Sequence, residues 1–332
     1  MIKEAGIWMM IVTLFILPVI QSQDASEAAG REQSEMIAAF NSEVKLARFF
    51  NNDPDTVLWA SNSGIELLNI RTNQMMDKIL SEEKIRALKV DPFNSKKAIA
   101  STISGRVYFI ELKDGKLVPQ LVQELSQGDV HIIRQFLFHP QKPGFVYAAD
   151  SNTIYCSKDN GLSWMQNMPI KIPEEERIII VMIPSIAHED KFLVSTTQGG
   201  RYLIDWEFTS LEEVVESAIP HGHSIGTNTR SYILKGPNEQ IFGFKHLDIQ
   251  MLDGLYFFDQ QNGPVIYGAG IGTSPIKWQK KGHRIFVYHI CPRLHMTFSI
   301  DVFPSDQTRI ILTDPNGIFV TENAGKDWVR IK

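Results

Sequence analysis

Cysteine is scarce in this chain, which contains only Cys156 and Cys291 among its 332 residues. A disulfide scaffold needs a dense set of cysteines, so this sequence must depend on an apolar core instead. The hydrophobic fraction of 43% is sufficient for such a core. We expect two buried free thiols, and a Cys156–Cys291 disulfide is the alternative.

Runs of basic residues are also missing. The formal net charge is −5, and the lysines and arginines are spread along the chain. Nucleic-acid binding depends on clustered basic side chains that neutralise phosphates. The composition therefore argues against a nucleic-acid partner.

The apolar run from Ile7 to Ile20 is shorter than the roughly 20 residues that a helix needs to cross a bilayer. It follows Lys3 and is followed by polar and small residues, a pattern that predicts a signal peptide over residues 1–23. An uncleaved signal anchor is the alternative, and only in that case do we expect membrane contact. Both interpretations predict an exported protein, either secreted or periplasmic.

Residues 24–42 are polar and rich in alanine and glutamate, which predicts a flexible or weakly helical lead-in. Helical periodicity is rare in the rest of the chain. Residues 211–217, LEEVVES, are one short helix candidate.

A repeating unit begins after residue 42. Each copy has a corner with proline, a short apolar strand, a turn with glycine or asparagine, and a second strand. The corner prolines are Pro54, Pro92, Pro140, Pro184, Pro237 and Pro304. A period of roughly 40 to 50 residues, built only of strands, is typical of propeller blades.

The sequence therefore predicts an all-β fold, a single β-propeller over residues 43–332. Seven four-stranded blades are expected, or six if residues 254–290 are a long insertion. We also expect a strand within Glu43–Phe50 to complete the last blade and close the ring.

Two turns share one pattern of residue types. Residues 157–164 read SKDNGLSW, with Ser157, Asp159, Gly161 and Trp164 at the key positions. The Asp159 carboxylate can accept hydrogen bonds from amides of its own turn, Gly161 can adopt a positive φ angle, and Trp164 can pack on the sheet. A second copy reads TENAGKDW over residues 321–328, and its corresponding residues are Thr321, Asn323, Gly325 and Trp328.

The pattern S-x-D-x-G-x-x-W resembles the Asp-box, or BNR repeat, of sialidase-like and sortilin-like propellers. The resemblance implies that the box is structural and lies away from the ligand face, so Asp159 is not expected to be catalytic. Sialidases carry an Arg-Ile-Pro motif near the first blade, and this chain has only Lys171-Ile172-Pro173 in its middle. A true sialidase is therefore not expected, whereas a peptide-binding mode similar to that of sortilin-type receptors stays open.

Glycoside hydrolases of this fold use two carboxylates that face each other across a cleft. No pair can be singled out here, and we assign no catalytic residue. Glu174–Glu176 and Glu212–Glu213 read as solvated faces. The candidate acids are Asp205, Glu207, Asp248, Asp253 and Asp259.

Histidines suggest a metal site only weakly. His221 and His223 form an H-x-H pair, but Pro220 and Gly222 indicate a loop, and no third ligand stands at a characteristic spacing. We therefore predict no metal and no cofactor. His139, before a corner proline, is expected to be structural. The other histidines considered are His246, His283, His289 and His295.

Within the predicted propeller, Trp59, Trp206 and Trp278 lie outside the two turns. Aromatic side chains at the mouth of a propeller can bind sugars or peptides, although packing between blades is their more common role. Trp206 is the tentative ligand-face residue.

The sequence favours a binding or scaffold module that recognises a protein or glycan partner through loops at one end of the ring. A glycoside hydrolase or lyase with a carboxylate pair in the central cleft is the alternative. Whether the protein is an enzyme is left open, with the non-enzymatic interpretation preferred.

Overall fold

In the computed structural model, residues 43–332 form one compact unit. The predicted signal peptide and lead-in lie outside the described residues. All regular elements in the described part are strands. The structure describes residues 45–122, 132–165, 170–173, 179–185, 188, 190–196, 201–213, 223–224, 229–233, 250–259, 263–271, 275–281, 284–291, 294 and 297–331.

The described strands form six antiparallel sheets, named A to F in chain order. Sheets A and B contain β1 (Leu46–Phe50), β2 (Asp53–Ser61), β3 (Gly64–Asn69) and β4 (Gln74–Ile79), then β5 (Ile85–Asp91), β6 (Asn94–Thr102), β7 (Val107–Lys113) and β8 (Lys116–Leu121). Sheets C and D contain β9 (Gln135–Phe138), β10 (Val146–Ala149), β11 (Thr153–Ser157) and β12 (Ile170–Lys171), then β13 (Ile179–Pro184), β14 (Lys191–Thr196), β15 (Arg201–Asp205) and β16 (Leu211–Glu213).

Sheet E is the exception, because it has six strands in the order β17-β18-β22-β21-β20-β19. Its strands are β17 (His223–Ser224), β18 (Thr229–Ile233), β19 (Gln250–Asp259), β20 (Gly263–Ile271), β21 (Ile276–Lys281) and β22 (Arg284–His289). Sheet F contains β23 (Ser299–Val302), β24 (Ile310–Asp314), β25 (Gly317–Thr321) and β26 (Val329–Arg330).

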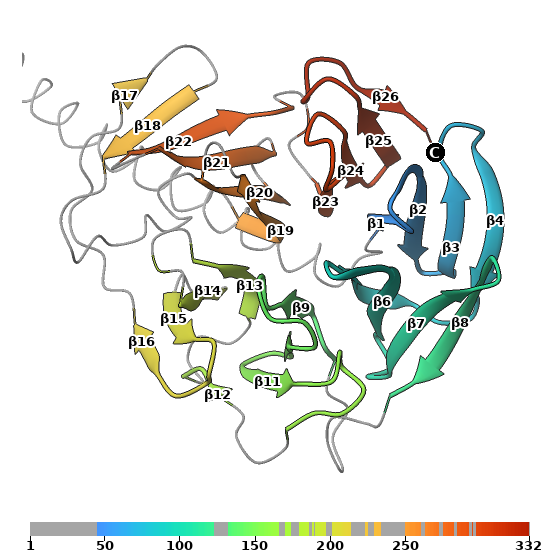
Figure 1. Cartoon of the computed structure of the whole chain (residues 1–332), viewed down its shortest axis with the longest axis horizontal. Coiled ribbons are helices and arrows are strands. Elements are labelled where there is room, and N and C mark those ends of the chain that lie inside the picture. Colours follow the sequence, from blue (N-terminus) through green and yellow to red (C-terminus); the bar gives the residue numbers. More distant parts are fainter. Residues whose placement is uncertain are drawn as a thin grey trace, which may run out of the picture. The chain divides into compact units, whose positions relative to one another are not determined.

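One strand of each sheet contacts the corresponding strand of the next sheet, in the order β1, β5, β9, β13, β19, β23 and back to β1. Figure 1 shows β1, β9, β13, β19 and β23 around the centre of the sheet arrangement. The other strands of sheets A, B, C, D and F follow outwards in chain order. The six sheets therefore form a closed ring, and we call β1, β5, β9, β13, β19 and β23 the inner strands.

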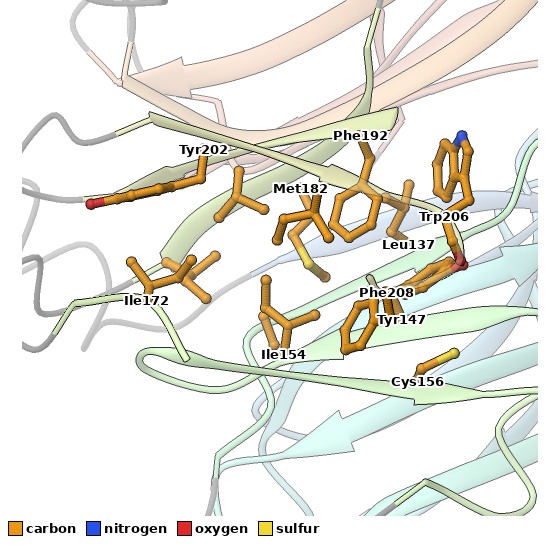
Figure 2. Packing of buried hydrophobic residues seen from close by; sticks show 14 residues of the cluster. Leu137, Tyr147, Ile154, Cys156, Ile172, Met182, Phe192, Tyr202, Trp206 and Phe208 are labelled. Atoms are coloured by element: carbon orange, nitrogen blue, oxygen red, sulfur yellow. The ribbon is translucent and has the colours of Figure 1, made fainter. Parts of the chain in front are cut away.

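The apolar core lies between neighbouring sheets. One cluster joins sheets C and D through Tyr147, Phe192 and Trp206 (Figure 2). Similar clusters join A to B, B to C, E to F and F to A. Because such a sheet is covered on both faces, its middle strand is apolar in both directions, and all four residues of β10 are buried.

Six sheets correspond to the smaller of the two expected blade numbers. The expected sixth unit falls in sheet E, whereas Pro237, which marks the expected fifth unit, and much of residues 214–249 lie outside the described part. Seven blades for the whole chain therefore stays a prediction.

Two local expectations are wrong. The strand within Glu43–Phe50 does not complete the last sheet, because β1 pairs with β2 inside sheet A, and sheet F has four strands of its own. The helix candidate at residues 211–217 begins with a strand: Leu211–Glu213 pairs with β15 along the outer edge of sheet D. Hydrogen bonding to this sheet edge overrides the weak helical propensity of the segment.

Side chains of sheet F close the ring at β1. The backbone N–H of Phe49 donates a hydrogen bond to the Asp301 Oδ2 at 2.7 Å, and that of Ala47 donates to the Ser299 Oγ at 3.1 Å. These amides lie on the inner edge of sheet A, where an unpaired N–H would be costly once buried.

Arg48 connects three sheets at the same place. Its Nη1 donates to the carbonyl of Ile300 on β23 at 3.2 Å, and its Nε donates to the carbonyl of Leu88 on β5 at 3.1 Å. Arg48 is buried. A guanidinium with several fixed donors is suited to join strands that do not pair directly.

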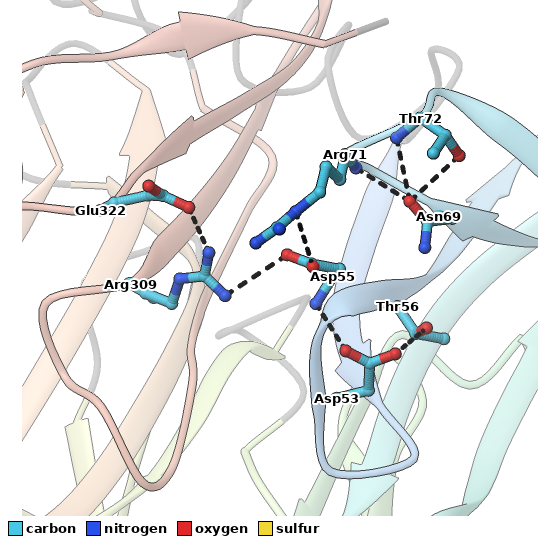
Figure 3. Close-up of polar contacts among 8 residues, drawn as sticks. All are labelled: Asp53, Asp55, Thr56, Asn69, Arg71, Thr72, Arg309 and Glu322. Atoms are coloured by element: carbon cyan, nitrogen blue, oxygen red, sulfur yellow. Dashed lines mark hydrogen bonds and ion pairs between the residues drawn. The ribbon is translucent and has the colours of Figure 1, made fainter.

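An ion-pair network links sheets F and A (Figure 3). Asp55, on β2, pairs with the Arg309 Nη1 at 3.4 Å and with the Arg71 Nε at 2.9 Å. Arg309 also pairs with Glu322. The Arg71 side chain is 70% exposed, so its pair with Asp55 is expected to contribute little to stability.

Replacement of Arg48 tests the closure. Arg48→Met should lower the free energy of unfolding by about 2–4 kcal/mol, because it leaves carbonyls of two neighbouring sheets without their donor. Arg71→Met is the matched control and should change it by less than about 0.5 kcal/mol. Equilibrium denaturation of both variants measures the difference. Equal, small effects would show that Arg48 does not hold the ring together.

Candidate functional site

The turn at residues 157–164 is organised by the side chains of Ser157 and Asp159. The Ser157 Oγ donates to the Asp159 Oδ1 at 2.8 Å and accepts a hydrogen bond from the Gly161 N–H at 2.8 Å. The Asp159 Oδ1 also accepts from the Ser163 N–H at 2.8 Å. Burial alone would raise the pKa of Asp159, but hydrogen bonds from Ser163 and Ser157 lower it. This carboxylate is therefore committed to its own turn.

The turn at residues 321–328 has the same geometry. The Thr321 Oγ1 donates to the Asn323 Oδ1 at 2.8 Å and accepts from the Gly325 N–H at 3.1 Å. The Asn323 Oδ1 accepts from the Asp327 N–H at 2.9 Å. An amide oxygen therefore takes the place of the carboxylate oxygen of Asp159 without a charge.

Both turns pack against the preceding sheet. Trp164 is half-buried and lies 6.4 Å from the Phe136 ring, within the cluster between sheets B and C. Trp328 packs on the cluster between sheets E and F, and its Nε1 donates to the Ile290 carbonyl at 3.3 Å. The tryptophans therefore lie in corresponding surroundings, each pinning one sheet to its neighbour.

The glycines at these turns are required by close approach. Gly161 has φ 87°, and a Cβ there would lie 2.5 Å from the Ile99 Cδ1 of sheet B. Gly325 has φ 88°, and a Cβ there would lie 2.4 Å from the Ile290 carbonyl oxygen of sheet E. The positive φ angle disfavours larger residues at both positions, and at Gly325 the backbone carbonyl also leaves no space for them.

Trp206 does not reach a ligand face. It is 5% exposed and lies within ring-stacking distance of His139 (4.5 Å), Phe192 (5.0 Å) and Tyr147 (5.5 Å). The Tyr147 hydroxyl donates to the Trp206 carbonyl at 2.5 Å. Figure 2 shows the indole inside the cluster between sheets C and D. The tentative assignment of Trp206 to a ligand face is therefore wrong, because its side chain is packed between sheets C and D.

His139 holds the corner before Pro140. Its Nδ1 accepts hydrogen bonds from the N–H groups of Gln141 and Lys142, both at 3.0 Å. An aspartate does the same in the corner of sheet B, where the Asp91 Oδ1 accepts from the Phe93 N–H at 2.8 Å. The ring nitrogen of His139 must be unprotonated to accept. Burial, and then the Lys142 charge, lower its pKa to about 4, while Glu207 acts in the opposite direction.

The candidate acids are described only in part. Burial alone would raise the pKa of Asp205, but hydrogen bonds from Ser210 and Thr209 lower it to about 2. Glu207 is exposed and pairs with Lys142, and Glu212 pairs with Lys191 at the edge of sheet D. Residues 174–176, Asp248 and the side chains of Asp253 and Asp259 lie outside the described part.

The structure describes both cysteines, but only some of the histidines and tryptophans singled out in the sequence. Cys156 and Cys291 are buried thiols that are not joined in a disulfide, as expected. Among the described residues, no group of three or more His, Cys, Asp or Glu could hold a metal ion. Trp59 is buried between sheets F and A. Outside the described part lie His221, His246, His283 and His295 and the side chains of His223 and Trp278.

The strand order gives the ring two different ends. In a four-stranded antiparallel sheet, the first corner and the third turn lie at one end, and the second turn and the connection to the next sheet lie at the other. The corner prolines and the turns at 157–164 and 321–328 therefore share what we call the corner end. The opposite, connection end carries the second turns and the links between sheets.

Sequence reasoning missed the basic side chains of the inner strands. Arg48 lies on β1, Arg86 and Lys89 lie on β5, and Arg134 directly precedes β9. Arg48 and Arg86 are buried, and Lys89 and Arg134 are half-buried. A signal was present, because Arg86 and Arg134 each stand five residues before the corner residue, Asp91 or His139. The acidic composition of the whole chain concealed this local basic character.

Asp301 accompanies these basic residues on the inner strand of sheet F. Burial raises its pKa to about 6, while the Arg48 charge acts in the opposite direction. Because Asp301 accepts the Phe49 N–H and Arg48 donates to carbonyls, both side chains serve the ring closure.

Known structures share this architecture. The chain is similar to the β-propeller domain of Cps50 (Swd1) from Myceliophteria thermophila, with TM-score 0.50 and 12% identity over 85% of this chain and 97% of that one. The fold is a β-propeller. A second similar structure is the GH74 enzyme of Niastella koreensis, with TM-score 0.50 and 12% identity over 86% of this chain and 45% of that one. At this identity the likeness concerns the propeller alone.

Sequence comparisons add no relative. No family profile and no curated protein sequence matches the chain. Within the ranges that the structure describes, no helix has the length and apolarity to span a membrane.

A pair of glycine variants tests the packing of the 321–328 turn. Gly325→Ala should destabilise the propeller by about 2–4 kcal/mol, because it adds a clash with the Ile290 carbonyl oxygen to the cost of a positive φ angle. Gly115→Ala is the matched control, since Gly115 has φ 76° and a Cβ there meets nothing within 4 Å. Its cost should be about 1 kcal/mol. Thermal and urea denaturation compare the two, and equal costs would contradict the close contact with Ile290.

The pH dependence of stability tests the His139 corner. Because the folded-state pKa lies below the ordinary value, stability is fully present above about pH 6.5 and falls as the pH decreases towards 4. At pH 4.5 the loss from this residue should be about 2 kcal/mol relative to pH 7. His139→Asn keeps an acceptor that does not titrate and should show a flatter profile. Parallel denaturation profiles of parent and variant would rule out this role.

Proposed function

We propose that this β-propeller is an exported binding or scaffold module that holds a protein or glycan partner at its connection end. The proposal treats residues 1–23 as the export signal. It also treats the turns at 157–164 and 321–328 as Asp-box repeats with a purely structural role.

The proposal rests on the different structural roles of the two ends of the ring. At the corner end, polar side-chain atoms of Asp159, Asn323 and His139 accept hydrogen bonds within their own turns. These turns also pin neighbouring sheets together through Trp164 and Trp328. Loops that hold a scaffold together are poorly suited to adapt to a partner, so the proposal places the partner at the opposite end.

The connection end of sheet B shows what such a surface offers. Glu83 accepts a hydrogen bond from the Ser104 hydroxyl at 3.2 Å and pairs with Arg106. Beside them, the Ile103 side chain is 46% exposed, and its N–H donates to the Lys84 carbonyl at 2.9 Å. An apolar side chain on a hydrogen-bonded polar base can anchor a partner.

A glycoside hydrolase or lyase is the alternative. Of its candidate acids, Asp205 is committed to a turn and Glu207 to an ion pair with Lys142. Such an enzyme would need two carboxylates facing one cleft, with at least one held protonated near neutral pH. The binding proposal needs only the surface of the connection end.

Binding and hydrolysis screens on a glycan array, with the purified full-length chain, separate the two functions. The binding proposal predicts retention of a ligand without cleavage, whereas release of a reducing end would support the hydrolase. Binding to a peptide array tests whether the partner is a protein. Cleavage in the screen, or no retention on either array, would count against a binding module.

Two exposed apolar residues at opposite ends then locate the surface. Ile103→Asp, at the connection end, should weaken binding of a retained ligand by roughly tenfold, because a charge replaces an apolar contact. Leu162→Asp, at the corner end, is the matched control, since Leu162 is 41% exposed. It should leave the affinity unchanged. A larger loss from Leu162→Asp would reverse the assignment of the ends.

A further inference from the structure

Two methionines stand next to each other on the last strand of sheet A. Met75 and Met76 belong to β4, which pairs only with β3 among the described strands and forms the outer edge of this sheet (Figure 1). Met75 is 53% exposed and Met76 is 41% exposed. Both side chains are therefore open to dissolved reagents.

The local register explains why two successive side chains are both exposed. In a regular strand, successive side chains point to opposite faces. Here Asp77 lies opposite Leu67 and Met75 lies opposite Leu68, which leaves Met76 as an extra residue on β4. Such a β-bulge redirects a side chain out of the regular alternation. The bulge therefore helps to keep two neighbouring thioethers out of the core.

Hydrogen bonds hold the chain on both sides of the two methionines. The Asp77 Oδ2 accepts from the Leu117 N–H of β8 at 2.7 Å. In the turn that precedes β4, the Asn69 Oδ1 accepts from the Arg71 N–H at 3.1 Å and from the Thr72 N–H at 2.9 Å. The exposure of the two methionines is therefore a property of the folded strand and needs no local unfolding.

Two further described methionines have different surroundings. Met182 is 3% exposed and lies in the cluster between sheets C and D (Figure 2). Met165 is half-buried and packs against the same cluster. A polar oxygen added to Met182 would be buried away from water, which is costly, whereas an oxygen added to a methionine of β4 stays in water.

Exposed thioethers react with two-electron oxidants such as peroxides. The sulfur attacks one oxygen of hydrogen peroxide, so that the O–O bond breaks and an S–O bond forms. The other oxygen takes up the proton of the transferred oxygen and leaves as water. The sulfur is oxidised by two electrons and the peroxide is reduced. The product, methionine sulfoxide, is polar and can be reduced again by methionine sulfoxide reductases.

We propose that Met75 and Met76 form a modification site on the outer strand of sheet A, where peroxide converts both thioethers to sulfoxides while the ring stays folded. The site goes beyond the proposed binding function and does not depend on it. Each sulfoxide turns an apolar side chain of this strand into a polar one, and the change is reversible. Met182 stays reduced, because the folded sheets C and D exclude the oxidant from it.

Oxidation of the folded full-length chain with hydrogen peroxide tests the site. Peptide mapping by mass spectrometry should show sulfoxide at Met75 and Met76 forming at least about tenfold faster than at Met182. The same treatment in guanidinium chloride should remove this difference, because unfolding exposes every methionine. The chain oxidised on β4 should keep a melting temperature within about 2 °C of the parent value. Methionine sulfoxide reductases should then restore the parent mass.

Two conservative variants check the assignment through the mass of the intact chain. The double variant Met75→Leu/Met76→Leu should take up two fewer oxygen atoms than the parent chain in the first phase of oxidation. Met182→Leu is the matched control and should leave that phase unchanged. Both variants exchange methionine for an apolar side chain of similar volume, which folded proteins tolerate well.

Equal oxidation rates at Met75, Met76 and Met182 in the folded chain would overturn the site, as would a faster reaction at Met182. Unfolding of the chain after oxidation of Met75 and Met76 alone would also overturn it, because the ring would then depend on these side chains. Should a variant fail to fold, the peptide map of the parent chain still decides. A negative result would leave the binding module standing, since the array screens do not involve oxidation.

Discussion

The whole ring depends on how the inner edge of β1 is satisfied. The amides of Ala47 and Phe49 donate to side chains of sheet F, and Arg48 joins the inner strands of sheets F and B. A closed ring of sheets covers both faces of each sheet, and the apolar middle strands require that cover. Without the junction between sheets F and A, both would expose an apolar face. Among the described strands none is exchanged between sheets F and A, and the propeller therefore closes through side chains that bridge these two sheets.

The two ends of the ring also differ in their structural role. At the corner end, side-chain oxygens hold the turns in shape. Glycines let these turns approach the preceding sheet closely, as Gly161 does at Ile99 and Gly325 at Ile290. At the connection end, the side chains of Asp150 and Asp314 also bond within their own turns, whereas Ile103 is exposed. Propellers host many unrelated functions, so the function has to be argued from such surface residues. The function proposed for this chain follows from that asymmetry and from the residues on it.

Periodicity and turn chemistry predicted the all-β propeller, because corner prolines and glycine-rich turns are local signals that survive in a single sequence. They also identified the key residues of the turns at 157–164 and 321–328, because side chains in these turns form hydrogen bonds with residues only a few positions away. Features set by distant contacts were missed. β1 stays in sheet A because Ser299 and Asp301 complete its edge, and Leu211–Glu213 is a strand because β15 offers an edge. Trp206 is buried by Tyr147 and Phe192 of neighbouring strands, a fate that composition alone does not reveal.

Hydrogen exchange at β1 tests the central claim most directly. If side chains of sheet F hold this strand, the amides of Ala47 and Phe49 should exchange only through global unfolding, as slowly as the amides of buried β10. Their exchange free energies should then equal the free energy of unfolding measured by denaturant. Fast exchange at Ala47 and Phe49, with β10 still protected, would show that β1 frays on its own and that the junction of sheets F and A does not close the ring.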